Sequence, residues 1–296
     1  MWGKYPGDDP DYQSPKGHRS QADEDDVAEI LNALLAAKRP IIVAGHGVLY
    51  AEASDELKAL AELLQIPVAT TLLGKSGFPE NYELSLGTSG RTLTKTAGHF
   101  ANEADFILGV GTSFTLNDFT ARMPTGKVLG QITNDPADIG KCRVVSCAAI
   151  GDAKFVINQL IRQAKGKLGD TGRERATETI EEISILKAEF HNEWAKRLHC
   201  NDDGPISPYR IIHEMNTLFD KSKSVVTHDA GNSLDQIVPF YEATSPRGCL
   251  AWGKSTQLVV ELSDGVRGKA RVAGGQFCGG RAVWYVRSGY RNCCSG

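Results

Sequence analysis

The sequence lacks the features that would point to a nucleic acid or a membrane as partner. The net charge is −3 over 296 residues, and Lys and Arg form no basic stripe, which excludes the electrostatic footprint of nucleic-acid binding. No apolar run approaches the length that a bilayer requires. The N-terminal residues contain neither a hydrophobic signal core nor an Arg-rich amphipathic pattern. We expect no nucleic acid, no membrane and a cytoplasmic location.

Cysteine is present, but the cysteines lack the spacing of a metal site or of a disulfide framework. The seven cysteines include no CxxC pair and are scattered along the chain, which is typical of neither a disulfide framework nor a zinc site. We therefore expect reduced thiols. The remaining composition, with 41% hydrophobic and 23% charged residues, indicates a globular protein with one large core or two ordinary ones.

Helical and strand patterns alternate along the first half of the chain. Apolar residues at helical spacing predict helices over residues 23–38, 54–65, 92–104 and 153–165, the second with Ser54 as its cap. Short apolar runs predict strands within residues 39–48, 66–73, 105–114, 127–135 and 143–152. This order predicts an α/β fold, a doubly wound, Rossmann-like parallel sheet with helices on both faces.

A second α/β unit is predicted after this sheet. Residues 178–199 form a long, charged helical pattern that looks like a connector. Residues 207–219 then predict a helix, residues 223–233 a strand running into a turn, and residues 249–258 the next segment of the unit.

Ligands of open α/β sheets bind at the carboxyl ends of strands, so each strand-to-turn segment is a candidate site. The turn "VAGHGV", with His46 between two glycines, could present N–H groups to a phosphate, but a plain tight turn is favoured. Asp135 in "ITNDPADIGK" could accept a hydrogen bond from a ribose hydroxyl or could cap a helix. In "THDAGNSLDQ", Gly231, Asn232 and Ser233 supply donors for a diphosphate, although an ordinary turn explains them equally well.

The segment "GCLAWGKS" matches the P-loop pattern GxxxxGK[ST] from Gly248 to Ser255. A P-loop requires an apolar strand immediately upstream, whereas "YEATSPR" precedes Gly248 here. Bulky Leu250 and Trp252 would also fill a loop whose backbone must approach phosphate closely. A nucleoside-triphosphatase is therefore disfavoured.

Taken together, these segments resemble the thiamine-diphosphate-dependent enzymes of the acetolactate synthase and benzoylformate decarboxylase group. The resemblance covers roughly residues 2–258 and rests on "RPIIVAGHGV", "PVATTLLGKSGFPENYELSLG", "ADFILGVGTSF", "ITNDPADIGK", "THDAGN" and "WGKSTQL" in this order. It implies an exit segment of a pyrimidine-binding domain (1–23), a central α/β domain (24–166), a helical connector (167–204) and the start of a diphosphate-binding domain (205–258).

The resemblance also implies the cofactors, the substrate class and the site residues. Gly231, Asn232 and Ser233 would contact the diphosphate, and Trp252, Gly253 and Lys254 would lie near the cofactor rings. Thiamine diphosphate and Mg²⁺ are the implied cofactors, and FAD is possible because some relatives bind it. The implied enzyme is a homo-oligomer that acts on a 2-oxo acid, as a decarboxylase or as an acetolactate synthase-like carboligase.

Two parts of the family pattern are not found. The glutamate that meets the aminopyrimidine ring would precede Met1, and the metal motif, GDG followed by Asn, does not follow "WGKSTQL". We therefore expect an inactive fragment of such an enzyme. A nucleotide-binding module, for FAD or for ATP at the P-loop pattern, or a subunit-interaction module without catalysis is the alternative.

Composition changes abruptly near Leu258. Residues 259–296 hold eight of the 31 glycines and carry a net charge of +4, with no apolar period that a helix or strand could use. If the codons of this tail are read one base later, the new reading frame can encode "PEVNFVGDG" and "SGLDIETAVR". These strings resemble the segments that follow a "WGKSTQL"-like stretch in the family. We interpret this tail as a product of out-of-frame translation.

Overall fold

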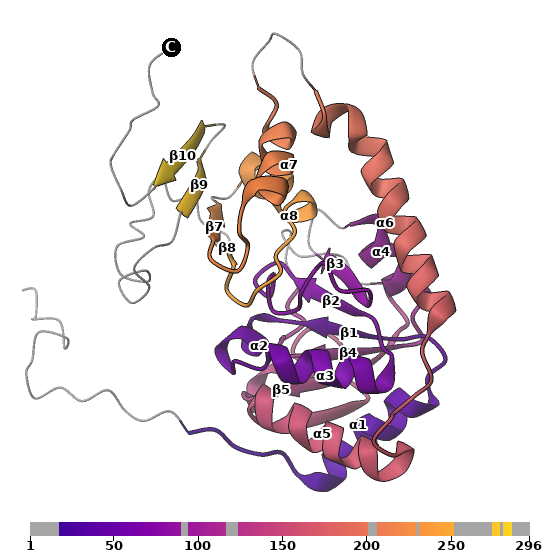
Figure 1. The fold of residues 1–296 in the computed structure, drawn as a ribbon. Helices are drawn as coiled ribbons and strands as arrows, with labels where there is room; N and C mark the ends of the chain where they lie inside the picture. The colour runs from indigo at the N-terminus through magenta and orange to yellow at the C-terminus, as the bar shows by residue number, and fades with distance from the viewer. Residues whose placement is uncertain are drawn as a thin grey trace, which may run out of the picture.

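The central unit is built on a six-stranded parallel sheet (Figure 1) with the strand order β3-β2-β1-β4-β5-β6. The computed structural model describes residues 18–89, 94–116, 124–200, 206–228, 231–251, 274–278 and 281–285. The strands are β1 (Pro40–Ala44), β2 (Val68–Thr71), β3 (Ser85–Ser89), β4 (Phe106–Val110), β5 (Val128–Thr133) and β6 (Cys147–Ile150). The predicted doubly wound α/β fold is confirmed.

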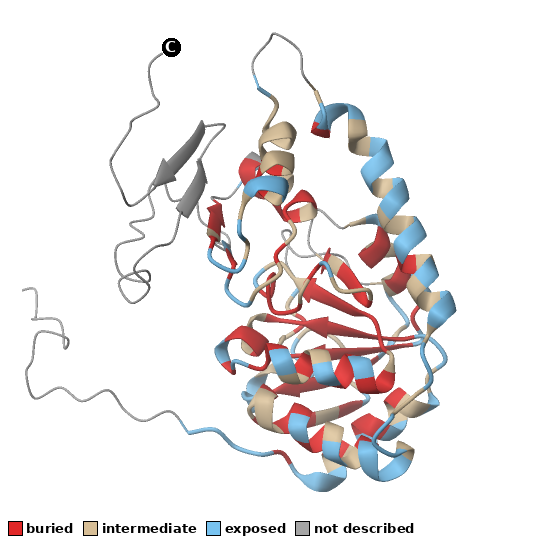
Figure 2. Ribbon diagram, in the orientation of Figure 1, coloured by how far each residue is buried: buried red, intermediate tan, exposed pale blue. Residues whose placement is uncertain are grey.

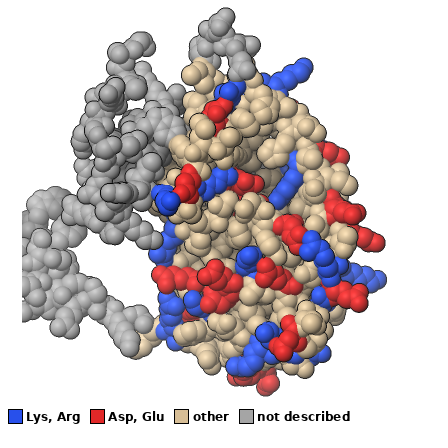
Figure 3. All heavy atoms as spheres, in the orientation of Figure 1, with Lys and Arg blue, Asp and Glu red and all other residues tan. Residues whose placement is uncertain are grey.

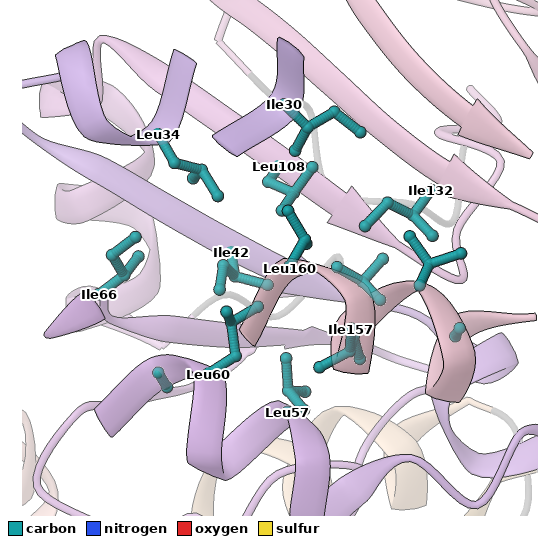
Figure 4. Packing of buried hydrophobic residues seen from close by; sticks show 14 of the residues in the cluster. Ile30, Leu34, Ile42, Leu57, Leu60, Ile66, Leu108, Ile132, Ile157 and Leu160 are labelled. Atoms are coloured by element: carbon teal, nitrogen blue, oxygen red, sulfur yellow. The ribbon is translucent and has the colours of Figure 1, made fainter. Parts of the chain in front are cut away.

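Helices cover both faces of this sheet because side chains alternate along each strand. Ile42 and Ala44 of β1 pack into one hydrophobic cluster, shown in Figure 4, with the helices α1 (Glu24–Ala36), α3 (Ser54–Leu64) and α5 (Ala153–Leu168). Ile41 and Val43 pack on the opposite face, against α4 (Lys95–Glu103) and Ile183 of α6 (Thr177–Leu198). The strands are accordingly buried, and the helices are exposed on their outer sides (Figure 2).

The long helix α6 is bound to the central unit by ion pairs. Arg39 lies 2.9 Å from Glu182, and Lys95 lies 2.9 Å from both Glu189 and Glu193.

Acidic and basic side chains are interspersed on the face of the molecule shown in Figure 3. No described helix is both long and apolar enough to cross a membrane.

The second unit consists of α7 (Pro208–Leu218), β7 (Val225–His228), α8 (Asn232–Phe240) and β8 (Cys249–Ala251), and the carboxyl half of α6 packs against it. Its core holds an aromatic cluster in which the rings of Phe190 and Phe240 stack with centroids 5.3 Å apart. Helices α7 and α8 lie beside the β3 edge of the central sheet (Figure 1), and α6 contacts both α4 and α7. The helices predicted over residues 178–199 and 207–219 and the strand predicted within residues 223–233 are therefore present.

Two local expectations were wrong, and one strand was not predicted. The turn after β1 contains a short helix, α2 (His46–Tyr50). No prediction was made for β3, which carries few apolar residues. Ser54 does not cap α3: it is the first helical residue, after Ala53. Its buried Oγ has no hydrogen-bond partner within the described part of the chain.

The tail also departs from the expectation that no strand forms there. β9 (Gly274–Cys278) pairs parallel with β7, and β10 (Arg281–Tyr285) pairs antiparallel with β9, giving a sheet of order β10-β9-β7-β8. Backbone groups make such a ladder, so it forms without an apolar period in the sequence. The other residues of 259–296 lie outside the described residues.

Candidate functional site

The turn between β7 and α8 presents backbone donors at a helix N-terminus. Gly231 precedes the first helical residue with φ +79° and ψ −142°, and its carbonyl accepts a hydrogen bond from Asp235 N at 3.1 Å. The N–H groups of the first helical turn have no partner within a helix, and the helix dipole is positive at this end. This arrangement suits an anion such as a diphosphate.

The three predicted turn residues lie together at this helix end. Asn232 is the first residue of α8, and Ser233, the second, is buried. A Cβ added to Gly231 would have no atom of the described residues within 4 Å. The positive φ, and not crowding by these residues, therefore favours glycine there. The structure brings Gly231, Asn232 and Ser233 together, and their contact with a ligand stays a prediction.

The other three predicted ligand-contact residues, Trp252, Gly253 and Lys254, lie outside the described residues. The strand before them is described. β8 pairs parallel with β7, with His228 opposite Ala251, so the carboxyl ends of both strands are at the same edge of the second sheet.

The P-loop interpretation is wrong. Cys249, Leu250 and Ala251 form β8, which is paired with β7, yet the pattern requires these positions to be a loop that follows a strand. The thiol of Cys249 is fully buried, and this burial raises its pKa to about 12. It is therefore a neutral core residue and not a nucleophile.

In the central unit, the glycine-rich turns after β1 and β4 pack against each other. A Cβ on Gly45 would lie 2.3 Å from the Gly111 carbonyl oxygen, and one on Gly47 would lie 2.7 Å from the Gly111 Cα. Gly47 N also donates to Gly111 O at 2.9 Å. This backbone contact accounts for the glycines, although the segment after β1 is the short helix α2 and not the tight turn that was expected.

Asp135 acts as a cap. Its Oδ1 accepts a hydrogen bond from Ala137 N at 2.9 Å, at the start of the short 3-10 helix Pro136–Asp138. The capping alternative is thus confirmed. Neither this residue nor the glycine turns add support for FAD, whose binding stays a prediction.

A metal site is not found among the described residues, where no three His, Cys, Asp or Glu side chains are grouped to hold an ion. The described residues fit the diphosphate end of the implied cofactor, because the α8 turn offers backbone donors at a helix N-terminus. They do not supply a ligand set for Mg²⁺.

Sequence analysis did not identify Lys75 and Glu80, which are buried and in contact in the structure. Lys75 Nζ lies 2.7 Å and 2.6 Å from the two carboxylate oxygens of Glu80. The signal available was a lysine and a glutamate in the Gly- and Pro-rich stretch between two strands. That pattern alone is typical of an exposed loop.

Comparison with known proteins agrees with this architecture. Residues 27–160 match the family model described as "Thiamine pyrophosphate enzyme, central domain". The chain is 34% identical over 240 residues to a probable acetolactate synthase large subunit of Methanocaldococcus jannaschii, a match that covers 77% of this chain and 38% of the relative. The corresponding protein of Methanococcus aeolicus is 32% identical over 239 residues, covering 77% of this chain and 39% of the relative.

A third relative, the acetolactate synthase large subunit of Haemophilus influenzae, is 29% identical over 281 residues, which is 88% of this chain and 46% of that protein. The chain thus spans less than half the length of these curated relatives. The family model covers the six strands of the central sheet and the helices between them, and the chain belongs to the family of thiamine-diphosphate-dependent enzymes.

Proposed function

We propose that this chain is part of an acetolactate synthase-like enzyme that uses thiamine diphosphate and Mg²⁺ to act on a 2-oxo acid. One observation carries the proposal: the matches to acetolactate synthase large subunits extend over about 240 residues, whereas the central-domain match covers only residues 27–160. The similarity therefore includes residues beyond the central domain. The proposed reaction is either the decarboxylation of the 2-oxo acid or a carboligation of the acetolactate synthase type.

The role proposed for the chain's own residues is binding. The first-turn N–H groups of α8 would hold the diphosphate, with Gly231 allowing its close approach and Ser233 adding a donor. Trp252, Gly253 and Lys254 are proposed near the rings. Bound thiamine diphosphate supplies the chemistry that breaks or forms a carbon–carbon bond beside the substrate carbonyl.

Equilibrium binding tests this proposal. We expect isothermal titration of the purified chain to detect thiamine diphosphate in the presence of Mg²⁺, and to detect ATP more weakly or not at all. A parallel titration with FAD tests the flavin prediction. Binding of FAD or ATP without thiamine diphosphate would instead favour the nucleotide-binding module, and binding of none of the three would favour the subunit-interaction module.

We expect the 296-residue chain by itself to turn over neither pyruvate nor benzoylformate. Its printed sequence contains no GDG motif, and its described residues hold no cluster of metal ligands. Without a held Mg²⁺ the diphosphate is not anchored for catalysis in the family's way. Carbon dioxide release from either substrate above a buffer blank, with purified protein, would contradict this expectation.

The domain organisation is also proposed: a central domain over residues 24–166, a connector over 167–204 and a diphosphate-binding unit from 205 to 258. We expect limited proteolysis to leave a resistant fragment of about residues 24–165, because this segment contains the two large cores of the central sheet. Mass spectrometry of the fragments measures this. Equal protection of residues 259–296 would contradict the proposed boundary at 258.

For the tail we propose a change of reading frame near codon 258. The composition break and the family-like strings in the shifted frame support this, and a restored frame would supply the aspartate of the metal motif. We expect resequencing of the DNA to find one or a few bases gained or lost near this codon. A verified read that confirms the printed frame through Gly296 would refute the idea.

A homo-oligomeric state of the intact enzyme is proposed as well, as the family resemblance implies; the relatives named above are called large subunits, which suggests an enzyme of several subunits. The name is theirs, and it identifies no partner for this chain. Sedimentation equilibrium of the enzyme expressed from the full gene measures its oligomeric state directly, and a monomer at micromolar concentration would contradict the proposal.

A further inference from the structure

The contact between the two units is organised around one buried ion pair. Lys75 and Glu80 lie in the segment that joins β2 to β3, and they are 1% and 7% exposed. Glu80 Oε1 accepts hydrogen bonds from Lys75 Nζ at 2.7 Å and from Thr88 Oγ1 at 2.9 Å. Both partners belong to the central unit, so the carboxylate is fixed from that side.

The same glutamate binds the second unit through two hydrogen bonds to a single residue. Ala243 N donates to Glu80 Oε2 at 2.8 Å, and Glu80 N donates to Ala243 O at 2.9 Å. Lys187 of α6 donates to Glu80 O at 3.1 Å. Glu80 therefore connects the central sheet, the long helix and the second unit at one point.

Ala243 lies three residues after the end of α8, and the chain between them is also fixed. Asn216 of α7 donates to Phe240 O at 2.6 Å and accepts from Glu242 N at 3.0 Å. A nine-residue helix is about 13 Å long and moves as a rigid element. Holding its carboxyl end therefore sets where its amino end, the Gly231 turn, lies relative to the central unit.

We propose that Glu80 is a positioning residue for the Gly231 turn, acting through Ala243 and the rigid helix α8, with Lys75 as the counter-charge that holds it in place. An unpaired charge at this depth is strongly unfavourable. Loss of either partner should therefore release the link to Ala243 more readily than it unfolds the central sheet. This inference rests on the proposed function only for the identity of the ligand that the Gly231 turn binds.

Hydrogen–deuterium exchange of the full 296-residue chain, without ligand, tests the positioning. We expect Glu80→Gln and Lys75→Met each to raise the exchange rate of amides in α8 and in residues 241–249 by about tenfold or more. This increase corresponds to only part of the destabilisation that breaking a buried ion pair can cause. Exchange in α1 and β1 should stay within twofold of wild type. Glu80→Gln is isosteric and carries the test if Lys75→Met does not fold.

Two controls separate positioning from general destabilisation. Glu83→Gln removes a carboxylate three residues away whose partner, Arg175 at 2.6 Å, is exposed, and it should leave exchange in α8 unchanged. The double variant Lys75→Met/Glu80→Gln leaves no unpaired buried charge and should exchange more slowly in α8 than Lys75→Met. Equal acceleration in α1, β1 and α8, or no change in α8, would overturn the proposal.

Titration with thiamine diphosphate and Mg²⁺ gives the second readout. We expect Glu80→Gln to weaken binding about tenfold and Glu83→Gln to leave it unchanged. If wild type does not bind while Glu80→Gln still loosens α8, the positioning holds and the proposed function fails. If wild type and Glu80→Gln bind equally and exchange equally, the proposed function holds and the positioning fails.

Discussion

Replacing Gly111 by valine is expected to destabilise the central unit by about 2–5 kcal/mol. Gly111 has φ +61°, a conformation that costs an L-residue about 1–2 kcal/mol. Its Cβ would lie 2.7 Å from Gly47 Cα and from Val48 N, and because these are backbone atoms the two turns must separate. Such overpacking costs about 1–3 kcal/mol more. Urea unfolding followed by circular dichroism measures the change.

Gly166→Ala is the matched control for that experiment. Gly166 lies in α5, and an added Cβ meets no atom within 4 Å. Alanine is the better helix former by about 1 kcal/mol at an interior position, so the free energy of unfolding should stay equal or rise slightly. A Gly111→Val protein as stable as wild type would show that the turns after β1 and β4 do not need to touch.

Replacing Gly231 by alanine is expected to weaken the binding of thiamine diphosphate by about tenfold to a hundredfold, or about 1.4–2.8 kcal/mol. The backbone at φ +79° and ψ −142° is essentially restricted to glycine, and another residue there costs about 1–3 kcal/mol. The turn should relax to a negative φ, and the displaced backbone with its added methyl group should hinder the close approach of the diphosphate to the N–H groups of the first helical turn. Titration calorimetry in the presence of Mg²⁺ measures the affinity.

Gly126→Ala controls for the strain itself. Gly126 also has a positive φ, +76°, with no atom within 4 Å of an added Cβ, and it lies between α4 and β5, in the central unit. We expect this variant to lose some stability and to bind the cofactor as wild type does. Equal affinities of the Gly231→Ala and wild-type proteins would remove the turn from the proposed site.

The sequence by itself determined the central architecture, because local patterns specify local structure. Apolar runs such as Ile41–Val43 predicted a buried strand, and helical spacing of the buried residues Val27, Ile30, Leu31 and Leu34 predicted α1. In a chain that alternates such segments, the short crossovers leave a parallel sheet covered on both faces. The resemblance to a known family then identified the turn at Gly231 as the candidate diphosphate site.

Only the tertiary structure decided how segments far apart in the chain meet. The contact between Gly45 and Gly111, and the bonds between Glu80 and Ala243, join residues separated by 66 and 163 positions. Strand β3 likewise forms because it pairs with β2, although its own residues are weakly apolar. Local periodicity carries no information about such pairs, since the energy that selects them comes from close packing and from satisfying buried polar groups.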